Sequence, residues 1–277
     1  MSEDLKKRIP ENRVTVAQAD YSRSFIKNTF LQRVIFFSTF LLLWQLISYL
    51  GIYPRFLLPS PLEVVQTLCF GFFEADYLTA ILESFRRVLL GYSLAVLVGI
   101  FCGLAIARYK MLDNTIGVSL TALQSIPSVA WVPLALLWFG ISEAAVLFIV
   151  VLEAFIPSAL GVRTGVQTIP KEIIRAAQAL GARSVDLYIR VIFPSIIPQL
   201  ISSLRLSWAF AWRALIAGEL FINGLGIGQK LELGRSLADM SQVMAMIIII
   251  AILGYITDDL FFRNIEKEVQ KIWGFNK

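Results

Sequence analysis

Six long apolar runs constrain this chain more than any other feature of its sequence. A helix of about 20 apolar residues crosses the ~30 Å hydrocarbon core of a bilayer. Only 16% of the chain is charged, against roughly a quarter in a typical soluble domain. We therefore predict an all-α integral membrane protein with six transmembrane helices. The predicted spans are about Val34–Leu50, Val88–Ala107, Ile116–Phe139, Ala144–Val162, Ile197–Leu220 and Val243–Phe262.

Lysine and arginine are distributed unequally between the segments that join these runs. With both termini inside, the cytoplasmic segments hold 18 of them and the outer segments five. Positive residues accumulate on the cytoplasmic side of membrane proteins. We therefore predict a cytoplasmic segment over 1–33, a transmembrane domain over 34–262 and a cytoplasmic tail over 263–277. The net charge of +5 follows from this asymmetry and does not indicate a nucleic-acid partner.

Several kinds of chemistry are excluded by residues that the chain lacks. It has no histidine, and Cys69 and Cys102 lie in or near apolar segments, so we expect neither a metal site nor a disulfide. No Gly-x4-Gly-Lys-Ser/Thr loop occurs, so the chain has no recognisable nucleotide site of its own. We expect a protein that is not an enzyme and binds no cofactor.

One polar stretch, residues 168–195, separates the fourth and fifth runs. Apolar residues recur there at helical spacing, and Gly181 suits the left-handed position that ends a helix. Ser184 is a suitable cap for a second helix, and Pro194 is expected to end it. The stretch therefore predicts an amphipathic hairpin that lies outside the bilayer. A DNA-binding helix-turn-helix disagrees with the flanking membrane spans, and a solvated loop without a partner remains the alternative.

The spacing within this hairpin resembles the cytoplasmic loop of ABC importer permeases. That loop reads Glu-Ala-Ala, three residues, Gly, nine residues, then Ile-x-Leu-Pro; here Arg175, Val191 and Phe193 depart from it. The resemblance implies a coupling helix that docks into a groove of an ATPase subunit. The implied docking residues are Arg175, Ala176, Ala177, Gly181, Ala182, Ser184, Phe193 and Pro194.

The third run contains Pro127 and Pro133 on either side of Trp131. Two prolines release backbone carbonyls that must be satisfied by protein or water, so we predict a broken helix beside a pathway, with a packing kink as the alternative. The stretch 125–134, continuing to 138–141, resembles the nitrate, sulfonate, taurine and bicarbonate branch of these permeases. The resemblance covers roughly residues 80–260.

Polar side chains inside the spans are the candidates for a substrate pathway. Glu153 and Arg213 lie nearest the middle of consecutive spans, where a charge must be paired or hydrated. With Glu219 and Trp131 they are the predicted pathway residues, although a pair that only locks two spans together is the alternative. We expect Arg86, Arg87 and Arg205 to extend towards the membrane surfaces.

Small residues at four-residue spacing, Ala95, Gly99, Gly103 and Ala107, predict a close helix–helix contact. Between the first two spans, Gly51–Glu83 is predicted to be an outer loop with a surface helix at Leu62–Phe73. The loop is either a docking site or a connector. The glycines of 223–228 are typical of a periplasmic turn, because no strand precedes them as a dinucleotide-binding motif requires.

The resemblance implies a type I ABC importer permease fold in a bacterial inner membrane. It also implies a pathway for a small anion, two ATP-binding subunits that hold ATP and Mg²⁺, a second permease copy and a periplasmic binding protein. An ion-coupled secondary transporter is the main rival, because it also moves solutes without binding a nucleotide. A membrane-anchored sensor or assembly factor is a second rival.

Overall fold

The computed structural model describes residues 31–74 and 76–272, apart from the side chains of 184, 270 and 272, and its regular structure there is entirely helical. The predicted cytoplasmic segment therefore lies mostly outside the described residues. The chain divides into two units, Met1–Val65 and Gln66–Lys277. In the first unit, the apolar helix Leu31–Tyr49 matches the first predicted span. The Trp44 indole N–H then donates to the Pro59 carbonyl at 2.9 Å and holds the loop that follows.

Helix α2, Pro61–Phe73, confirms the predicted surface helix. A reciprocal capping box starts it: the Ser60 N–H donates to Glu63 Oε2 at 2.7 Å, and the Glu63 N–H donates to Ser60 Oγ at 3.3 Å. These two bonds satisfy donors that every helix leaves free in its first turn. The capping residues thus set where α2 begins.

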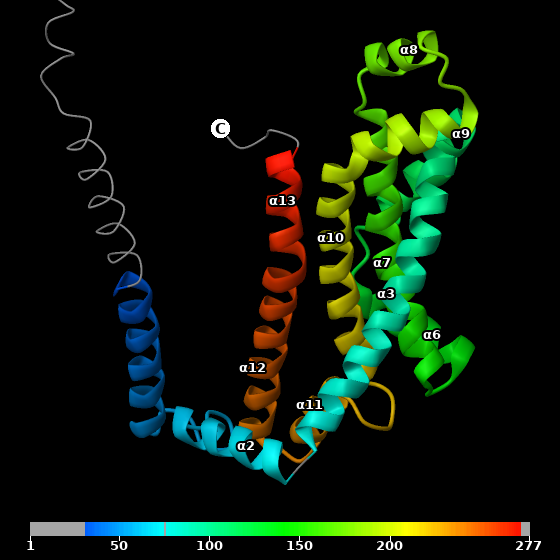
Figure 1. Ribbon diagram of the computed structural model, residues 1–277. Coiled ribbons are helices and arrows are strands. Elements are labelled where there is room, and N and C mark those ends of the chain that lie inside the picture. The colour runs from blue at the N-terminus through cyan, green and yellow to red at the C-terminus, as the bar shows by residue number, and fades with distance from the viewer. Residues whose placement is uncertain (1–30, 75, 273–277) are drawn as a thin grey trace, which may run out of the picture. The chain divides into compact units, whose positions relative to one another are not determined.

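Three long helices form the centre of the second unit: α3 (Tyr77–Arg108), α7 (Glu143–Gln167) and α10 (Phe193–Glu219) (Figure 1). Their close contact depends on small residues, as predicted. A Cβ on Gly103 would overlap the Ala159 carbonyl oxygen, and one on Gly99 would lie 2.8 Å from Ser158 Cβ. A Cβ on Gly161 would overlap Ser203 on α10. Close backbone approach is what holds membrane helices together.

Helix α3 begins at Tyr77 and contains the span predicted at Val88–Ala107, but residues 77–83, predicted to belong to the outer loop, are helical. The polar residues that ended the apolar pattern lie inside the helix. Arg86 pairs there with Glu83 and Glu143, at 3.0 and 2.8 Å. Because these charges find partners on the same and neighbouring helices, they do not terminate α3.

The third predicted span is broken, as expected from its prolines. The segment α4–η1–α5 (Lys110–Leu112, Asp113–Gly117 and Val118–Leu123) meets the segment η2–α6 (Ser128–Trp131 and Val132–Phe139) at 104°. Pro127 is extended at the break, and Pro133 occupies the first turn of α6, where its missing N–H costs nothing. Five described helices are long and apolar enough to cross a membrane, and this bent pair makes a sixth if it is one span.

The last predicted span is a nearly continuous helix made of α12 (Met240–Thr257), η4 (Asp258–Arg263) and α13 (Asn264–Ile272). It packs beside α10, where the Trp208 indole donates to Thr257 Oγ1 at 3.2 Å. Arg205 of α10 joins the two helices through Asp258 at 2.6 Å and Glu266 at 2.8 Å. Arg205 is thus held in ion pairs, which its predicted extension to the surface did not anticipate.

Candidate functional site

The polar hairpin has the predicted geometry at its corner. Helix α8, Lys171–Ala179, ends where Gly181 takes φ +93°. The Gly181 N–H donates to the Gln178 carbonyl and the Ala182 N–H to the Ala177 carbonyl, both at 3.0 Å. This is the Schellman arrangement, which satisfies the last carbonyls of a helix and needs a left-handed residue. The prediction that Gly181 takes the left-handed conformation that ends a helix is confirmed.

The second half of the hairpin does not end at Pro194, and that prediction was wrong. Helix α9 (Ser184–Leu187) continues through the π-helical turn η3 (Tyr188–Ile192) into α10. Pro194 lies in the first turn of α10, and Ser195 Oγ donates to the Val191 carbonyl at 2.6 Å. The wider π turn changes the hydrogen-bond register just before Pro194, so the helix passes the proline without breaking. The Ser184 side chain lies outside the described part, so its capping role stays a prediction.

The hairpin has one apolar face on the core and another that is exposed. The first face, Ile174, Leu187 and Tyr188, packs on a cluster of Val162, Ile169, Ile192, Ile196 and Leu200. The second is large: Leu180 is 90% exposed, and Val185 and Ile189 are about two-thirds exposed. Apolar residues gathered on an exposed surface mark an interaction site.

The predicted docking residues lie on or beside this exposed face. Arg175, Ala176 and Phe193 are exposed, and Ala177, Ala182 and Pro194 are half-buried. The hairpin stands at one end of the second unit, and α11 (Ile227–Ser236) stands at the opposite end (Figure 1). The structure thus has an exposed apolar surface on the hairpin, at one end of the second unit (Figure 1).

A second feature is a groove of about 310 Å³ between α7 and α10, beside Gln124 at the end of α5, with a lining that is partly polar and partly apolar. Its polar lining is Gln124, Thr164, Gln199, Ser202 and Ser203. The α7 and α10 residues recur every three or four positions, which places them on one face of each helix. Polar side chains inside a membrane domain need partners in protein or water. The sequence analysis did not predict these residues. Their helical spacing inside apolar runs would have indicated that they share one face of each helix.

Glu153 and Arg213 extend the same two faces. Glu153 lies one turn before Pro157 on α7, and Arg213 lies two turns after Leu206 on α10; both Pro157 and Leu206 line the groove. Glu153 is 5% exposed, and both Trp131 and Arg213 approach its carboxylate. Among the described residues, Arg213 forms no ion pair with it, and the Trp131 indole N–H approaches it without the geometry of a normal hydrogen bond.

The Arg213 side chain is exposed and lies along its own helix. Its Nε donates to the Ala209 carbonyl at 3.1 Å, and its guanidinium lies 4.7 Å from the centre of the Phe210 ring. The direct pairing that would make Glu153 and Arg213 a lock is therefore absent from the described contacts. Their charges are left to interact through water or a ligand.

Glu219 lies elsewhere, in a closed network with no exposed surface. Its carboxylate accepts bonds from Arg87 Nη1 at 2.7 Å, Ser84 Oγ at 2.8 Å and the Gly228 N–H at 3.0 Å. Arg87 is thus buried in an ion pair, and its predicted extension to the membrane surface was wrong. The reason is that a buried arginine with a carboxylate partner does not need to reach water. The pathway role of Glu219 stays a prediction.

Comparison with known proteins agrees with this geometry. Residues 95–271 match the model of the binding-protein-dependent transport system inner membrane component. The chain is 34% identical over 63% of its length to a putative ABC transporter permease of Methanocaldococcus jannaschii, of which the match covers 66%. It is 28% identical to the putative aliphatic sulfonates transport permease SsuC of Bacillus subtilis, over 83% of each chain. It is also 28% identical to the taurine permease TauC of Escherichia coli, over 79% of this chain and 81% of TauC.

The fold is similar to a chain of the inward-facing MetNI methionine ABC transporter. The TM-score is 0.55 at 17% identity, and the match covers 69% of this chain and 98% of the other. This likeness concerns the fold alone. Taken with the family match over residues 95–271, it shows that this chain belongs to the family of inner membrane components of binding-protein-dependent transport systems.

Proposed function

We propose that this chain is the permease subunit of an ATP-driven importer for a small anion of the sulfonate, taurine, nitrate or bicarbonate type. Relatives named as sulfonate, taurine and nitrate permeases support the substrate class. In this proposal two copies of the chain form the passage. Two ATP-binding subunits that hold ATP and Mg²⁺ dock on the hairpins in the cytoplasm, where both termini lie, and a periplasmic binding protein delivers the solute.

The hairpin is built to transmit force. Its buried face rests on the inner ends of α7 and α10 through Val162 and Ile196. These helices are locked together because Gly161 admits Ser203, and Ser207 Oγ donates to the Ala154 carbonyl at 2.5 Å. Movement of the docked hairpin therefore carries α7 and α10 as one body, and the groove that they line moves with them.

The exposed Arg213 is the observation that carries the proposal. An arginine facing lipid near the middle of a span costs about 2.5–3.5 kcal/mol on insertion scales. Arg213 is exposed, lies six residues before the end of α10 at Glu219, and forms no ion pair among the described residues. A water-filled passage removes this cost, and the guanidinium then attracts an anion. The buried Glu153 carboxylate nearby disfavours a solute with a large negative charge.

The test is uptake by proteoliposomes that contain the chain, its ATPase subunits and its binding protein. We expect uptake of a labelled sulfonate or nitrate to require ATP and to resist a proton ionophore. Arg213→Gln should lower uptake about tenfold or more, as loss of a charge-assisted contact predicts, without loss of the assembled complex.

Two control variants test whether a loss of uptake comes from the charge of Arg213. Arg213→Lys keeps the charge and should retain part of the uptake, whereas Arg263→Gln removes an exposed arginine that pairs with Asp259 within η4 and should leave uptake unchanged. Uptake driven by the proton gradient without ATP would contradict the proposal and favour the ion-coupled rival. Full uptake by Arg213→Gln would remove Arg213 from the passage.

A further inference from the structure

A small pocket lies where α3 meets the π turn η3 and the start of α10. Its volume is about 190 Å³, and its lining is Leu104 of α3, Tyr188, Ile189 and Ile192 of η3, and Phe193 of α10. The accessible part of this lining is almost wholly carbon. The pocket is open at the surface, since Ile189 is 64% exposed and Phe193 is 46% exposed. It therefore has room for an apolar group from outside the chain.

The position of Leu104 places this pocket at the edge of the hydrocarbon layer. Helix α3 is apolar over residues 88–107 and ends at Arg108. A helix of about 20 apolar residues spans the ~30 Å core of a bilayer. Leu104 thus lies one helical turn inside the end of the apolar segment. Tyr109 follows directly after α3, at the level where tyrosine is enriched in membrane proteins.

An apolar stripe on α3 leads from the pocket towards the middle of the membrane. Leu94, Leu97, Val98 and Phe101 are all exposed, and their spacing puts them on the same face of the helix as Leu104. The stripe therefore runs along the direction that an acyl chain takes beside a membrane helix. The pocket lies at the end of the stripe that is nearer the hairpin.

Two cations stand where this stripe reaches the membrane surface. Arg108 lies four residues after Leu104, on the same face of α3, and Lys110 begins α4. Both side chains are exposed. The Arg108 guanidinium lies 5.6 Å from the centre of the Tyr109 ring, and among the residues that the structure describes neither cation forms an ion pair. Cations next to a membrane span attract the anionic headgroups of phospholipids.

We propose that this pocket holds the first part of an acyl chain of an anionic phospholipid, whose phosphate binds Arg108 and Lys110. The lipid belongs to the leaflet on the hairpin side, and its chain continues along the stripe past Phe101. A protein that docks from the water does not fit this place, because Leu104 lies within the hydrocarbon layer. Phe193, which the resemblance implied for ATPase docking, is thereby assigned to the lipid.

The π turn supports a binding role for this pocket. Three of its five lining residues belong to η3, and π-helical turns are rare and frequent at functional sites. The same turn joins the hairpin to α10. A lipid held there contacts α3 on one side and the base of the hairpin on the other, so it fills the space between them.

The test uses the full-length chain, purified with the subunits that accompany it, in phosphatidylcholine vesicles. These vesicles also contain a phosphatidylglycerol with a photoreactive diazirine in its acyl chain, close to the glycerol. After illumination, mass spectrometry identifies the labelled residues. We expect labels within 101–104 and 188–193, and we expect unlabelled phosphatidylglycerol to compete better than phosphatidylcholine. Arg108→Gln should reduce this labelling about fivefold, the loss expected for one cation near an anionic membrane surface.

Two further variants separate charge from space. Arg263→Gln removes an exposed arginine that pairs with Asp259 within η4, and it should leave the labelling unchanged. Ile189→Trp enlarges an exposed lining residue and keeps every charge. It should reduce the labelling of Leu104, because the chain loses its space in the pocket.

Three outcomes would overturn the inference. The first is equal labelling by lipids with glycerol and choline headgroups, or unchanged labelling in Arg108→Gln. The second is labelling confined to the stripe at Leu97 and Phe101, which would mean that lipid passes the pocket without entering it. The third is a photo-crosslinking residue at Phe193 that captures an ATPase subunit or a second copy of the chain and no lipid. The labelling needs neither ATP nor solute, so it is measured independently of the proposed transport.

Discussion

Single charged residues within the membrane domain follow two different rules. Arg87 and Glu219 are buried and paired with each other; Ser84 Oγ and the Gly228 N–H also donate to Glu219, whereas Arg87 Nε has no hydrogen-bond partner. Arg213 is exposed, without an ion pair among the described residues. A charge buried in a membrane protein needs a partner, whereas a charge on the surface of a span needs water or another subunit. The first kind holds the fold together, and the second kind marks a candidate passage.

The Arg87–Glu219 pair predicts an asymmetry between single and double substitutions. Glu219→Ala leaves the Arg87 charge buried without its partner and should destabilise the protein by about 3–5 kcal/mol. Arg87→Met combined with Glu219→Leu removes both charges and should cost less than Glu219→Ala. Unfolding of the detergent-purified protein, followed by circular dichroism during denaturant titration, measures both. With Arg87→Met and Glu219→Leu also measured singly, a double variant that loses the sum of these two losses would show that the groups do not stabilise each other.

At the level of elements, the hairpin shows how two local signals produce a rigid lever. The left-handed Gly181 closes α8, and the π turn η3 joins α9 to α10 without a break. The helix that carries the groove residues therefore begins inside the hairpin. Under the proposed function, a force on Val185 or Ile189 reaches Gln199 and Ser202 along this one helix.

Gly181 gives the sharpest test of this lever. No atom lies within 4 Å of a Cβ built there, so a substitution acts through backbone strain alone. Gly181→Val should cost about 1–2 kcal/mol in the left-handed conformation and redirect α9. We expect membrane insertion to survive and ATP hydrolysis stimulated by the binding protein to fall several-fold.

Gly181→Asn is the matched control, because asparagine tolerates the left-handed conformation better than other residues with a Cβ. It should retain most of the stimulated ATP hydrolysis. Equal stimulation in the valine and asparagine variants would mean that the geometry of this corner does not transmit the signal.

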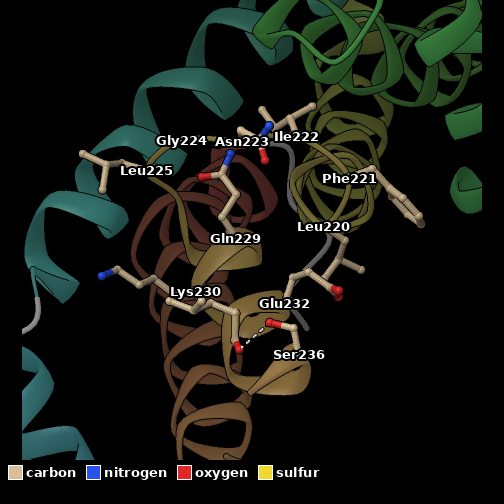
Figure 2. Close-up of a pocket in the computed structure, with 11 residues that line it drawn as sticks. Leu220, Phe221, Ile222, Asn223, Gly224, Leu225, Gln229, Lys230, Glu232 and Ser236 are labelled. Carbon is tan, nitrogen blue, oxygen red and sulfur yellow. Dashed lines mark hydrogen bonds between the residues drawn. The ribbon is translucent and has the colours of Figure 1, made fainter. Parts of the chain in front are cut away.

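For the whole molecule, the two ends of the second unit carry different kinds of surface. One end bears the hairpin with its exposed apolar face, and the other bears a pocket of about 370 Å³ between the segment 220–225 and α11 (Figure 2). The helices α3, α7 and α10 connect them (Figure 1). A protein that couples binding on one side of a membrane to binding on the other needs a separate surface at each end. It also needs helices that connect the two surfaces.

Opposite orientation of these two ends is directly measurable. In a variant with Cys69 and Cys102 replaced by serine, cysteine is introduced at Leu180 on the hairpin or at Leu237 after α11, both well exposed. A membrane-impermeant maleimide should label Leu237→Cys in cells with a permeable outer membrane. Leu180→Cys should react only after the inner membrane is opened. Labelling of both positions from one side would contradict the predicted topology.

The sequence by itself determined the features that depend on neighbouring residues along the chain. Apolar runs of membrane length predict the spans, Pro127 and Pro133 predict the broken helix, and Gly181 predicts the end of α8. Each signal is local, because helix length, a missing N–H and a left-handed φ are properties of a few consecutive residues. The same locality explains the errors at the start of α3 and at Pro194, where a contact or a change of helical register overrides the local preference.

The tertiary structure alone decided which charges are buried and which surfaces are open. Arg87 and Glu219 are 132 residues apart in sequence, so no local pattern shows that they pair. The groove joins residues of α7 and α10 with Gln124 at the end of α5, and the unsatisfied amide of Gln229 appears only once the segment 220–225 covers it. Burial and hydrogen-bond satisfaction depend on what the rest of the chain brings to a residue, and only the packed helices supply that.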